Sequence, residues 1–319
     1  MESGFWKKLE GPISAAGPMA GVSDAAYREM LVRHGKPSVI WTEMMSTEGL
    51  SLKGAEEYSN ELMFSDSEKP VVIQFFGSRP KTFTASAAHA VSAGYSGIDI
   101  NMGCPDRNVE KQGAGASLIG KTKEVENIIE ATREGAGEIP VSVKTRIGYG
   151  SKEEMNDWIS FLAEQGFAAI SIHGRIREEL RGGDADWDAI SEAAKTIKKI
   201  SPETIVIGNG DVSSKADGER KTEIYGTDGY MAARATIGNP WLFSGYLPTK
   251  EERIEAALEH AGIFRDLFGD SRHFDILKTH FVGYMSDFDG AKELRVRFMQ
   301  TQSYKDVEDI VRSVLKKAA

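Results

Sequence analysis

The sequence predicts an α/β fold, namely a (β/α)8 TIM barrel followed by a small C-terminal helical bundle domain. Short runs rich in β-branched residues alternate with helical patterns as far as Trp241, and such apolar strands are typical of a parallel sheet covered on both faces. Glycine or polar residues follow each of these runs, as they do at the catalytic face of a barrel. Beyond Trp241 the strand-like runs stop and only helical patterns continue.

Eight strands are predicted, at Ile13–Ala16, Val39–Thr42, Val71–Phe75, Ile98–Ile100, Val141–Thr145, Ala169–Ile172, Ile205–Ile207 and Gly229–Met231. Helical patterns follow most of them, at Ala25–His34, Lys81–Ala93, Lys123–Glu134, Glu153–Gln165, Asp186–Ile200 and Ser214–Tyr225. This number of strands over roughly 240 residues matches the size of a closed barrel. An open doubly wound sheet is the alternative, which the lack of a G-x-G-x-x-G turn after the first strand disfavours.

The predicted barrel occupies residues 1–247, and residues 248–319 are predicted to form the helical domain. Gly245–Leu247 and Pro248 mark the boundary, because glycine and proline interrupt regular structure. The helical patterns of the second domain lie at Glu251–Phe268, Phe274–Asp287, Ala291–Gln300 and Tyr304–Lys317. We expect these helices to form a bundle that packs against the barrel.

The composition is that of a globular protein, since 40% of the 319 residues are hydrophobic and 27% are charged. A single cysteine excludes an internal disulfide and suits a reducing compartment. No apolar run has the length of a membrane helix, and Met1–Glu10 lacks the apolar core of a signal peptide. We therefore expect a cytoplasmic enzyme with no membrane partner, and no protein partner is indicated. The net charge of −9 argues against general nucleic-acid binding but leaves room for a local basic groove.

The most informative stretch runs from Ile98 to Leu118 and contains the single cysteine, Cys104. A reactive side chain on a loop just past the carboxyl end of a strand is how α/β barrels build active sites. Pro105 disfavours the α region for the residue before it, so the loop should hold the thiol in an extended pose. Cys104 could instead be an inert apolar filler. The flanking glycine, proline, Asp106 and Arg107 make a poor core site, which favours the reactive interpretation.

Polar side chains also stand at the ends of the other strands, and in a barrel these ends meet on one face. Gln74, Lys144 and His173 belong to strands three, five and six. Each has a structural alternative, because Gln74 could cap a loop, Lys144 could pair with a surface acid, and His173 could be a satisfied core histidine. Polar residues at every strand end together are harder to explain by stability alone. No group of Cys or His has metal-ligand spacing, so no metal is predicted.

The loops after the last two strands predict a phosphate site. Gly208-Asn209-Gly210-Asp211 allows close approach of the backbone to an anion, and Ala233-Arg234 adds N–H groups and a guanidinium. Barrels hold phosphates at these two loops. Gln74 and Lys144 suit the carbonyls and the N1 region of a flavin ring, because a cation near N1 stabilises the reduced flavin. Pro18 and Met19, after strand one, would form an apolar wall with backbone donors for the ring edge.

Taken in order, these pieces resemble the tRNA-dihydrouridine synthase family, flavoproteins that reduce uridine in tRNA. The matching motifs are G-P-M-A-G, T-E-M, V-I-Q-F-F-G, D-I-N-M-G-C-P, G-A-G-A-S-L, V-K-T-R-I-G, I-H-G-R, G-N-G-D and A-R-A-T-I-G-N-P-W, from Gly17 to Trp241. The later pieces L-K-T-H-F-V-G-Y and G-A-K-E-L-R look like the family's helical domain. Two positions depart from the family pattern: Gly17 stands where alanine is usual, and Ala233 stands where glycine is usual.

The resemblance implies roles for matched positions. Cys104 falls where the family has the general acid that protonates uracil C5, and FMN with NADPH or NADH would supply the hydride. Flavin or phosphate contacts would come from Gln74, Lys144, His173, Asn209, Gly210, Ala233 and Arg234. Residues near the substrate pocket would be Asn101, Arg175 and Arg177. Phosphates of tRNA would meet the C-terminal helices, at Lys292, Arg295 and Arg297, with Lys278 and His280 as further candidates; a solvated helix face explains each of these equally well.

Two other functions fit part of the pattern. An FMN barrel acting on a free pyrimidine, such as a dihydroorotate dehydrogenase, can also carry a cysteine near N-x-x-C-P, but it lacks a helical tail resembling Asp275–Arg297. A tRNA-binding protein without catalysis is the other alternative, which the intact Cys104, Lys144 and His173 disfavour.

Overall fold

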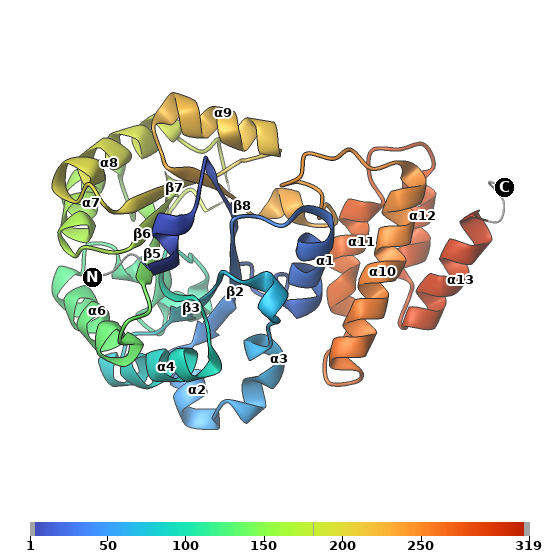
Figure 1. Ribbon diagram of the computed structural model, residues 1–319, viewed down its shortest axis with the longest axis horizontal. Helices are drawn as coiled ribbons and strands as arrows, with labels where there is room; N and C mark the ends of the chain where they lie inside the picture. The colour runs from blue at the N-terminus through green and yellow to red at the C-terminus, as the bar shows by residue number, and fades with distance from the viewer. Residues whose placement is uncertain (1–3, 181, 316–319) are drawn as a thin grey trace.

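The predicted barrel is confirmed by the computed structural model, which describes residues 4–180 and 182–315 (Figure 1). All neighbouring strands are parallel, and the sheet closes when the last strand pairs with the first. The strands are β1 (Ile13–Ala16), β2 (Val39–Ser46), β3 (Val71–Phe76), β4 (Gly97–Met102), β5 (Val141–Gly148), β6 (Ala169–Ile176), β7 (Ile205–Asn209) and β8 (Gly229–Ala232).

Each predicted helix is present, with small differences at its ends. The barrel helices are α1 (Ala25–Gly35), α4 (Pro80–Ala93), α6 (Thr122–Ala136), α7 (Met155–Glu164), α8 (Trp187–Ile200) and α9 (Lys215–Tyr225). The C-terminal helices are α10 (Lys250–Phe268), α11 (Leu277–Tyr284), α12 (Ala291–Met299) and α13 (Tyr304–Leu315). The last part of the helix expected to reach Lys317 lies outside the described residues. No helix within the described ranges is long and apolar enough to cross a membrane.

Short helices in the connecting loops were not predicted. They are α2 (Thr47–Lys53), α3 (Ser59–Leu62) and α5 (Arg107–Glu110), with 3-10 turns η1 (Gly4–Lys8), η2 (Glu56–Tyr58), η3 (Asp66–Glu68), η4 (Gly115–Leu118), η5 (Lys152–Glu154), η6 (Arg234–Thr236) and η7 (Phe274–Ile276). These elements are too short for a hydrophobic period to identify them. A local side-chain cap marks the start of α5, where the Asp106 carboxylate accepts from two backbone N–H groups.

Three strands continue three or four residues beyond their predicted ends, because the polar residues predicted to end them lie within the sheet. β2 extends to Ser46, β5 to Gly148 and β6 to Ile176. Irregular register between Trp41 and Met44, and between Arg146 and Gly148, accompanies the extension. The extra length matters for function, since it carries charged residues on rigid strands rather than on loops.

The interior of the barrel changes from apolar to polar along its axis. At the amino ends of the strands, Trp6 of η1 is buried against an apolar layer that includes Trp41, Ile207 and Met231. The next positions toward the carboxyl ends include the buried polar residues Gln74, Asp99, Ser142 and Ser171. Apolar packing therefore closes one end of the barrel, and the polar groups gather toward the other.

The C-terminal helices pack on the outside of the barrel against α1, as Figure 1 shows for the orange and red segments. Ala26 and Met30 of α1 share an apolar cluster with Ile254 and Phe264 of α10. Buried polar contacts cross the same boundary, because the His280 ring pairs with the carbonyl of Val22 at 3.2 Å.

A second contact between the two parts lies close to the carboxyl ends of the first strands. Arg272, in the turn after α10, donates to the Glu43 carboxylate at 2.8 Å. The other oxygen of Glu43 accepts from the Gly21 N–H at 2.6 Å, after β1. Glu43 and Arg272 are almost fully buried, so a desolvated ion pair ties the C-terminal helices to β2, and Glu43 in turn contacts the loop after β1.

A buried ion pair also fixes α1 to the loop before β3. Arg28 donates to Glu68 at 2.5 Å, and its other nitrogens donate to the carbonyls of Ser23 and Met63. Both charged side chains are buried. Neither charge has access to water, so each depends on the other for its stability in the fold.

Arg28→Met should lower the free energy of unfolding by about 3–5 kcal/mol, because it leaves the Glu68 carboxylate buried without its cationic partner. Denaturant titration measures the loss. The matched control is Arg33→Met on the same helix, whose ion pairs with Glu29 and Glu259 are partly exposed and are worth about 0–1 kcal/mol. If the two variants lose the same free energy of unfolding, burial adds nothing to the contribution of the Arg28 ion pair.

Candidate active site

Polar side chains from neighbouring strands meet at the carboxyl ends of the barrel strands. Register pairs Asn101 with Lys144 and His173 with Asn209. The Lys144 ammonium donates to the Asn209 side chain at 3.0 Å, across the intervening strand β6. Asn209 in turn donates to the Met231 carbonyl at 2.9 Å. The predicted residues of β4 to β7 are therefore brought together as the barrel topology requires.

The Cys104 loop is held by its own backbone. The Asn101 side-chain oxygen accepts from the N–H groups of Gly103 at 3.1 Å and Cys104 at 2.9 Å. Ala116 donates to the Cys104 carbonyl at 2.9 Å, which closes the loop onto the glycine-rich turn. Gly115 has a φ of 63°, and a Cβ there would lie 2.6 Å from that carbonyl oxygen. The turn therefore requires glycine so that it can support the cysteine.

The Cys104 thiol is half-buried and stays protonated at neutral pH. Burial is the main reason that its pKa is raised, and the negative charge of Asp106 adds to the effect. A backbone hydrogen bond and the positive charges of Arg146 and Lys144 act in the opposite direction without overcoming burial. The direction agrees with the neutral thiol expected of a general acid, and not with a low-pKa nucleophile.

Arg146 is a site residue that the sequence analysis did not identify. Its guanidinium donates to the Gly103 carbonyl at 2.7 Å and to the carbonyls of Ile176 and Leu180 at 3.1 and 3.2 Å. It thus fastens the Cys104 loop to the loop after β6. Burial lowers its pKa to about 10, and the cysteine is the first group that counteracts this shift. The available signal was its spacing, because alternate residues of a strand share a face and Lys144 is two positions earlier.

The Lys144 side chain is a cation at neutral pH, but its pKa is lower than that of an ordinary lysine. Burial and the neighbouring Arg146 lower its pKa to about 8, while the charges of Asp99 and Cys104 partly offset the effect. The pKa of His173 is also lowered. Burial first, and then the surrounding cations, lower its pKa well below the ordinary value, so its ring is neutral.

Asp211 organises the basic groups beside His173. It accepts from Arg175 at 2.5 Å and from Arg234 at 2.9 Å, and it also accepts from the Ala185 N–H. Burial alone would raise the pKa of Asp211, but these donors outweigh it and the pKa is lowered. The carboxylate is therefore ionised and fixes both guanidinium groups.

Two predicted substrate residues have roles within the fold. Arg175 is buried, and its guanidinium also contacts the His173 ring nitrogen and the carbonyls of Gly182 and Gly183. Arg177 donates to Glu110 of α5 through Nε, at 2.7 Å, and through Nη2, and it lies over the Tyr149 ring. Arg175 therefore lies beneath the site surface, whereas Arg177 joins the loop after β6 to the helix that follows Cys104.

The predicted cofactor residues occupy different depths. Pro18 and Met19 are partly exposed after β1. Gln74 is fully buried, and both ends of its amide are hydrogen-bonded within the barrel. Gly210 has a φ of 128° and packs against His173, while Ala233 precedes the η6 turn that carries the half-exposed Arg234. Gln74 is thus a predicted flavin contact that has no accessible surface in this structure.

The predicted tRNA residues lie on α12 and differ in availability. Lys292 is exposed. Arg295 donates twice to the Met285 carbonyl, and Arg297 donates to Ser313, so both guanidinium groups already have partners in the chain. Of the further candidates, Lys278 pairs with Asp275 at 2.6 Å. His280 is buried, so the expectation that it contacts phosphate is wrong.

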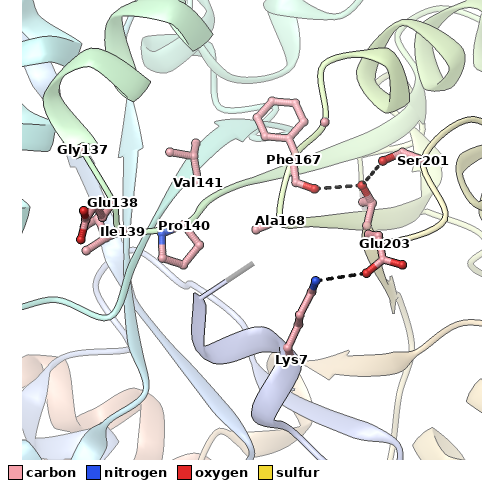
Figure 2. A pocket seen from close by; sticks show the side chains of 12 residues that line it. Lys7, Gly137, Glu138, Ile139, Pro140, Val141, Phe167, Ala168, Ser201 and Glu203 are labelled. Atoms are coloured by element: carbon pink, nitrogen blue, oxygen red, sulfur yellow. Dashed lines mark hydrogen bonds and ion pairs between the residues drawn. The ribbon is translucent and has the colours of Figure 1, made fainter. Parts of the chain in front are cut away.

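A cavity of about 540 Å³ lies away from these residues, at the amino ends of the strands. Figure 2 shows that Lys7 and Glu203 pair across it beside Pro140 and Phe167. These residues precede β5, β6 and β7, whereas the cluster around Cys104 follows the strands. Within the described residues no group of three His, Cys, Asp or Glu is arranged to hold a metal ion.

Comparisons with known proteins give a consistent match. The family model for dihydrouridine synthases matches residues 14–319. A probable tRNA-dihydrouridine synthase of Staphylococcus epidermidis is 36% identical over 321 residues, which cover 98% of this chain and 96% of that protein. A probable tRNA-dihydrouridine synthase 2 of Bacillus subtilis is 33% identical over 317 residues, again covering 98% of this chain and 96% of the other.

Solved structures share the fold at low identity. Histamine dehydrogenase from Rhizobium sp. 4-9 has a TM-score of 0.56 and 14% identity, covering 78% of this chain and 48% of that one. Morphinone reductase has a TM-score of 0.54 and 11% identity, covering 73% of this chain and 84% of that one. At these identities the likeness shows the barrel fold alone.

Alkylation of Cys104 by iodoacetamide should have a pH midpoint above that of the same thiol in the urea-unfolded chain. Thiolate is the reactive form, and burial raises the thiol pKa in the folded protein. The folded protein should therefore react more slowly at neutral pH. Because this is the single cysteine, labelling followed by mass spectrometry reads one site. A midpoint below the unfolded value would contradict the neutral thiol.

Proposed function

The chain belongs to the dihydrouridine synthase family, and we propose that it reduces the C5=C6 bond of a uridine in tRNA, with FMN as flavin and NADPH or NADH as reductant. Membership of the family makes it an oxidoreductase. One observation carries the finer proposal: a thiol that remains protonated lies beside two cations, the half-buried Lys144 and the buried Arg146, at the carboxyl ends of the strands.

The charge of the site fits a phosphate-bearing cofactor. Lys144, Arg146, Arg175 and Arg234 all depress the pKa of His173, so the local field is positive although the whole chain has a net charge of −9. A positive field at the ends of β7 and β8 attracts an anionic group to the position where barrels hold phosphates.

The backbone around this field also suits such a group. A Cβ at Gly210 would lie 2.5 Å from the Ala185 side chain, so only glycine fits there. We expect the phosphate to bind the loop of Asn209 and Gly210 and the backbone N–H groups at Ala233 and Arg234. The additional methyl of Ala233 leaves its N–H in place, so we expect it to be compatible with binding.

The ring of the flavin is expected near Lys144, with Pro18 and Met19 along its edge. When bound, reduced FMN supplies a hydride for C6 of the uracil. Cys104 donates its proton to C5, which requires the neutral thiol that burial maintains. Arg146 and Lys144 then stabilise the thiolate that remains, since both already interact favourably with the charged cysteine. Solvent subsequently returns a proton to the sulfur.

The substrate base must leave its stack to reach a site of this kind, which costs a few kcal/mol and is least costly in a tRNA loop. We propose that residues 248–319 form a domain that binds the rest of the tRNA. Lys292 is the best candidate of α12 for a phosphate contact, because it is exposed while Arg295 and Arg297 are bonded within the chain. The names of the relatives favour tRNA over a free pyrimidine, and the paired thiol and cations favour an enzyme over a non-catalytic binder.

Cys104→Ala should keep its flavin and its NADPH oxidation but lose dihydrouridine formation on unmodified tRNA by about 10²–10⁴-fold, the typical contribution of a general acid. Mass spectrometry of the tRNA nucleosides measures the product. Free uracil and dihydroorotate, assayed beside tRNA with the unaltered protein, test the rival substrates. Full tRNA reduction by the variant would remove Cys104 from the acid role.

Lys292→Glu should weaken tRNA binding and reduce the slope of log affinity against log salt by about one or more, as expected when phosphate contacts are lost. The matched control is Lys305→Glu on α13, because Lys305 is already paired with Glu308 and Asp309. If both variants have the same salt slope as the unaltered protein, tRNA binds elsewhere on the molecule.

A further inference from the structure

We propose that Asp99, which has no surface in the site, is a positioning residue that sets the direction of a hydrogen-bond chain holding the Cys104 thiol in place. The catalytic consequence rests on the function proposed above, but the positioning itself does not. The proposal is carried by the directions of the bonds as well as by their distances.

The chain of bonds runs from Asp99 to the cysteine without a break. Gln74 donates through its amide nitrogen to the Asp99 carboxylate at 2.7 Å. Asn101 donates through its amide nitrogen to the Gln74 oxygen at 2.8 Å. The Asn101 oxygen then accepts from the backbone N–H groups of Gly103 and Cys104 at 3.1 and 2.9 Å.

The two ends of this chain fix the orientation of both amides between them. A backbone N–H at Cys104 can only donate, and an ionised carboxylate at Asp99 can only accept. Each amide must therefore point its nitrogen toward Asp99 and its oxygen toward Cys104. A neutral group at position 99 that also donates would permit the reversed chain, in which the Asn101 amide nitrogen faces two backbone donors.

Burial makes this constraint strong. Asp99, Gln74 and Asn101 are buried on the inner face of the barrel, so water cannot replace a lost partner. Ser142 donates to the other oxygen of Asp99 at 2.6 Å. Burial raises the pKa of Asp99 to about 6, while the bonds from Gln74 and Ser142 and the charge of Lys144 favour the ionised form.

Loss of the chain should loosen the cysteine without unfolding the loop. Ala116 still bonds the Cys104 carbonyl, and Arg146 still bonds the carbonyl of Gly103. What disappears is the anchor on the N–H side of the cysteine. The half-buried thiol then becomes more accessible to a reagent and less well placed for a substrate.

The test is alkylation of Cys104 by iodoacetamide in the full chain as purified, measured at a pH where the thiol is fully ionised. At this limit a change in nearby charge does not alter the fraction of thiolate. Asp99→Asn should raise the limiting rate by about tenfold, the typical equivalent of one buried hydrogen bond. Dihydrouridine formation on tRNA should fall by a similar factor.

The decisive variant combines Asp99→Asn with Gln74→Glu. A carboxylate introduced at position 74 accepts from both neighbouring amides, so Asn101 recovers its orientation. The limiting rate should return to within about twofold of the unaltered protein. The control is Ser171→Ala, because this inward-facing hydroxyl on β6 is buried without a hydrogen-bond partner and its removal should leave the rate unchanged.

The outcomes separate the positioning role from the proposed reaction. An unchanged limiting rate in Asp99→Asn, or a double variant that does not fold or reacts like the single one, overturns the proposal. If Asp99→Asn alone does not fold, a folded double variant with the original rate still supports it. If Cys104→Ala retains full tRNA reduction, the acid role fails while the alkylation result still stands.

Discussion

Closure of the barrel is the constraint on which the site depends, because it forces the inward side chains of neighbouring strands into one narrow interior. Apolar residues fill the end that Trp6 closes, whereas Gln74, Asp99 and Ser142 occupy the next level. A polar group in that interior cannot reach water and must find its partner across the barrel. The same confinement that makes these groups costly also orders them, so the strand ends present fixed donors and charges.

The electrostatics of the molecule are strongly local. The chain as a whole is acidic, yet the ends of β5 to β8 gather Lys144, Arg146, Arg175 and Arg234 around one neutral histidine. Asp211 offsets two of these charges and fixes the geometry of their side chains. Net charge therefore says little about which ligand the mouth of the barrel accepts, because the field within about a Debye length is set by neighbours in space.

Much of the fold was predictable because each strand and each long helix has a local signature. The apolar runs placed all the strands, and the polar residues after them predicted that their side chains meet at one end of the barrel, as Lys144 and Asn209 do. The partners of Arg175 and Arg272 were not predictable, since Asp211 and Glu43 lie 36 and 229 residues away in the sequence. The predicted strand ended at Thr145, so Arg146 was not recognised as an inward-facing residue, although it lies two positions after Lys144.

The contact of Glu43 with both Gly21 and Arg272 has a mechanical consequence. One carboxylate accepts hydrogen bonds from both the turn after β1 and the turn after α10, and so joins them. A tilt of the C-terminal helices relative to the barrel is opposed by this contact, since loss of the Arg272 donor leaves the Glu43 charge desolvated and unpaired. A macromolecule that binds those helices and displaces them is therefore coupled, through Glu43, to the backbone of the loop after β1.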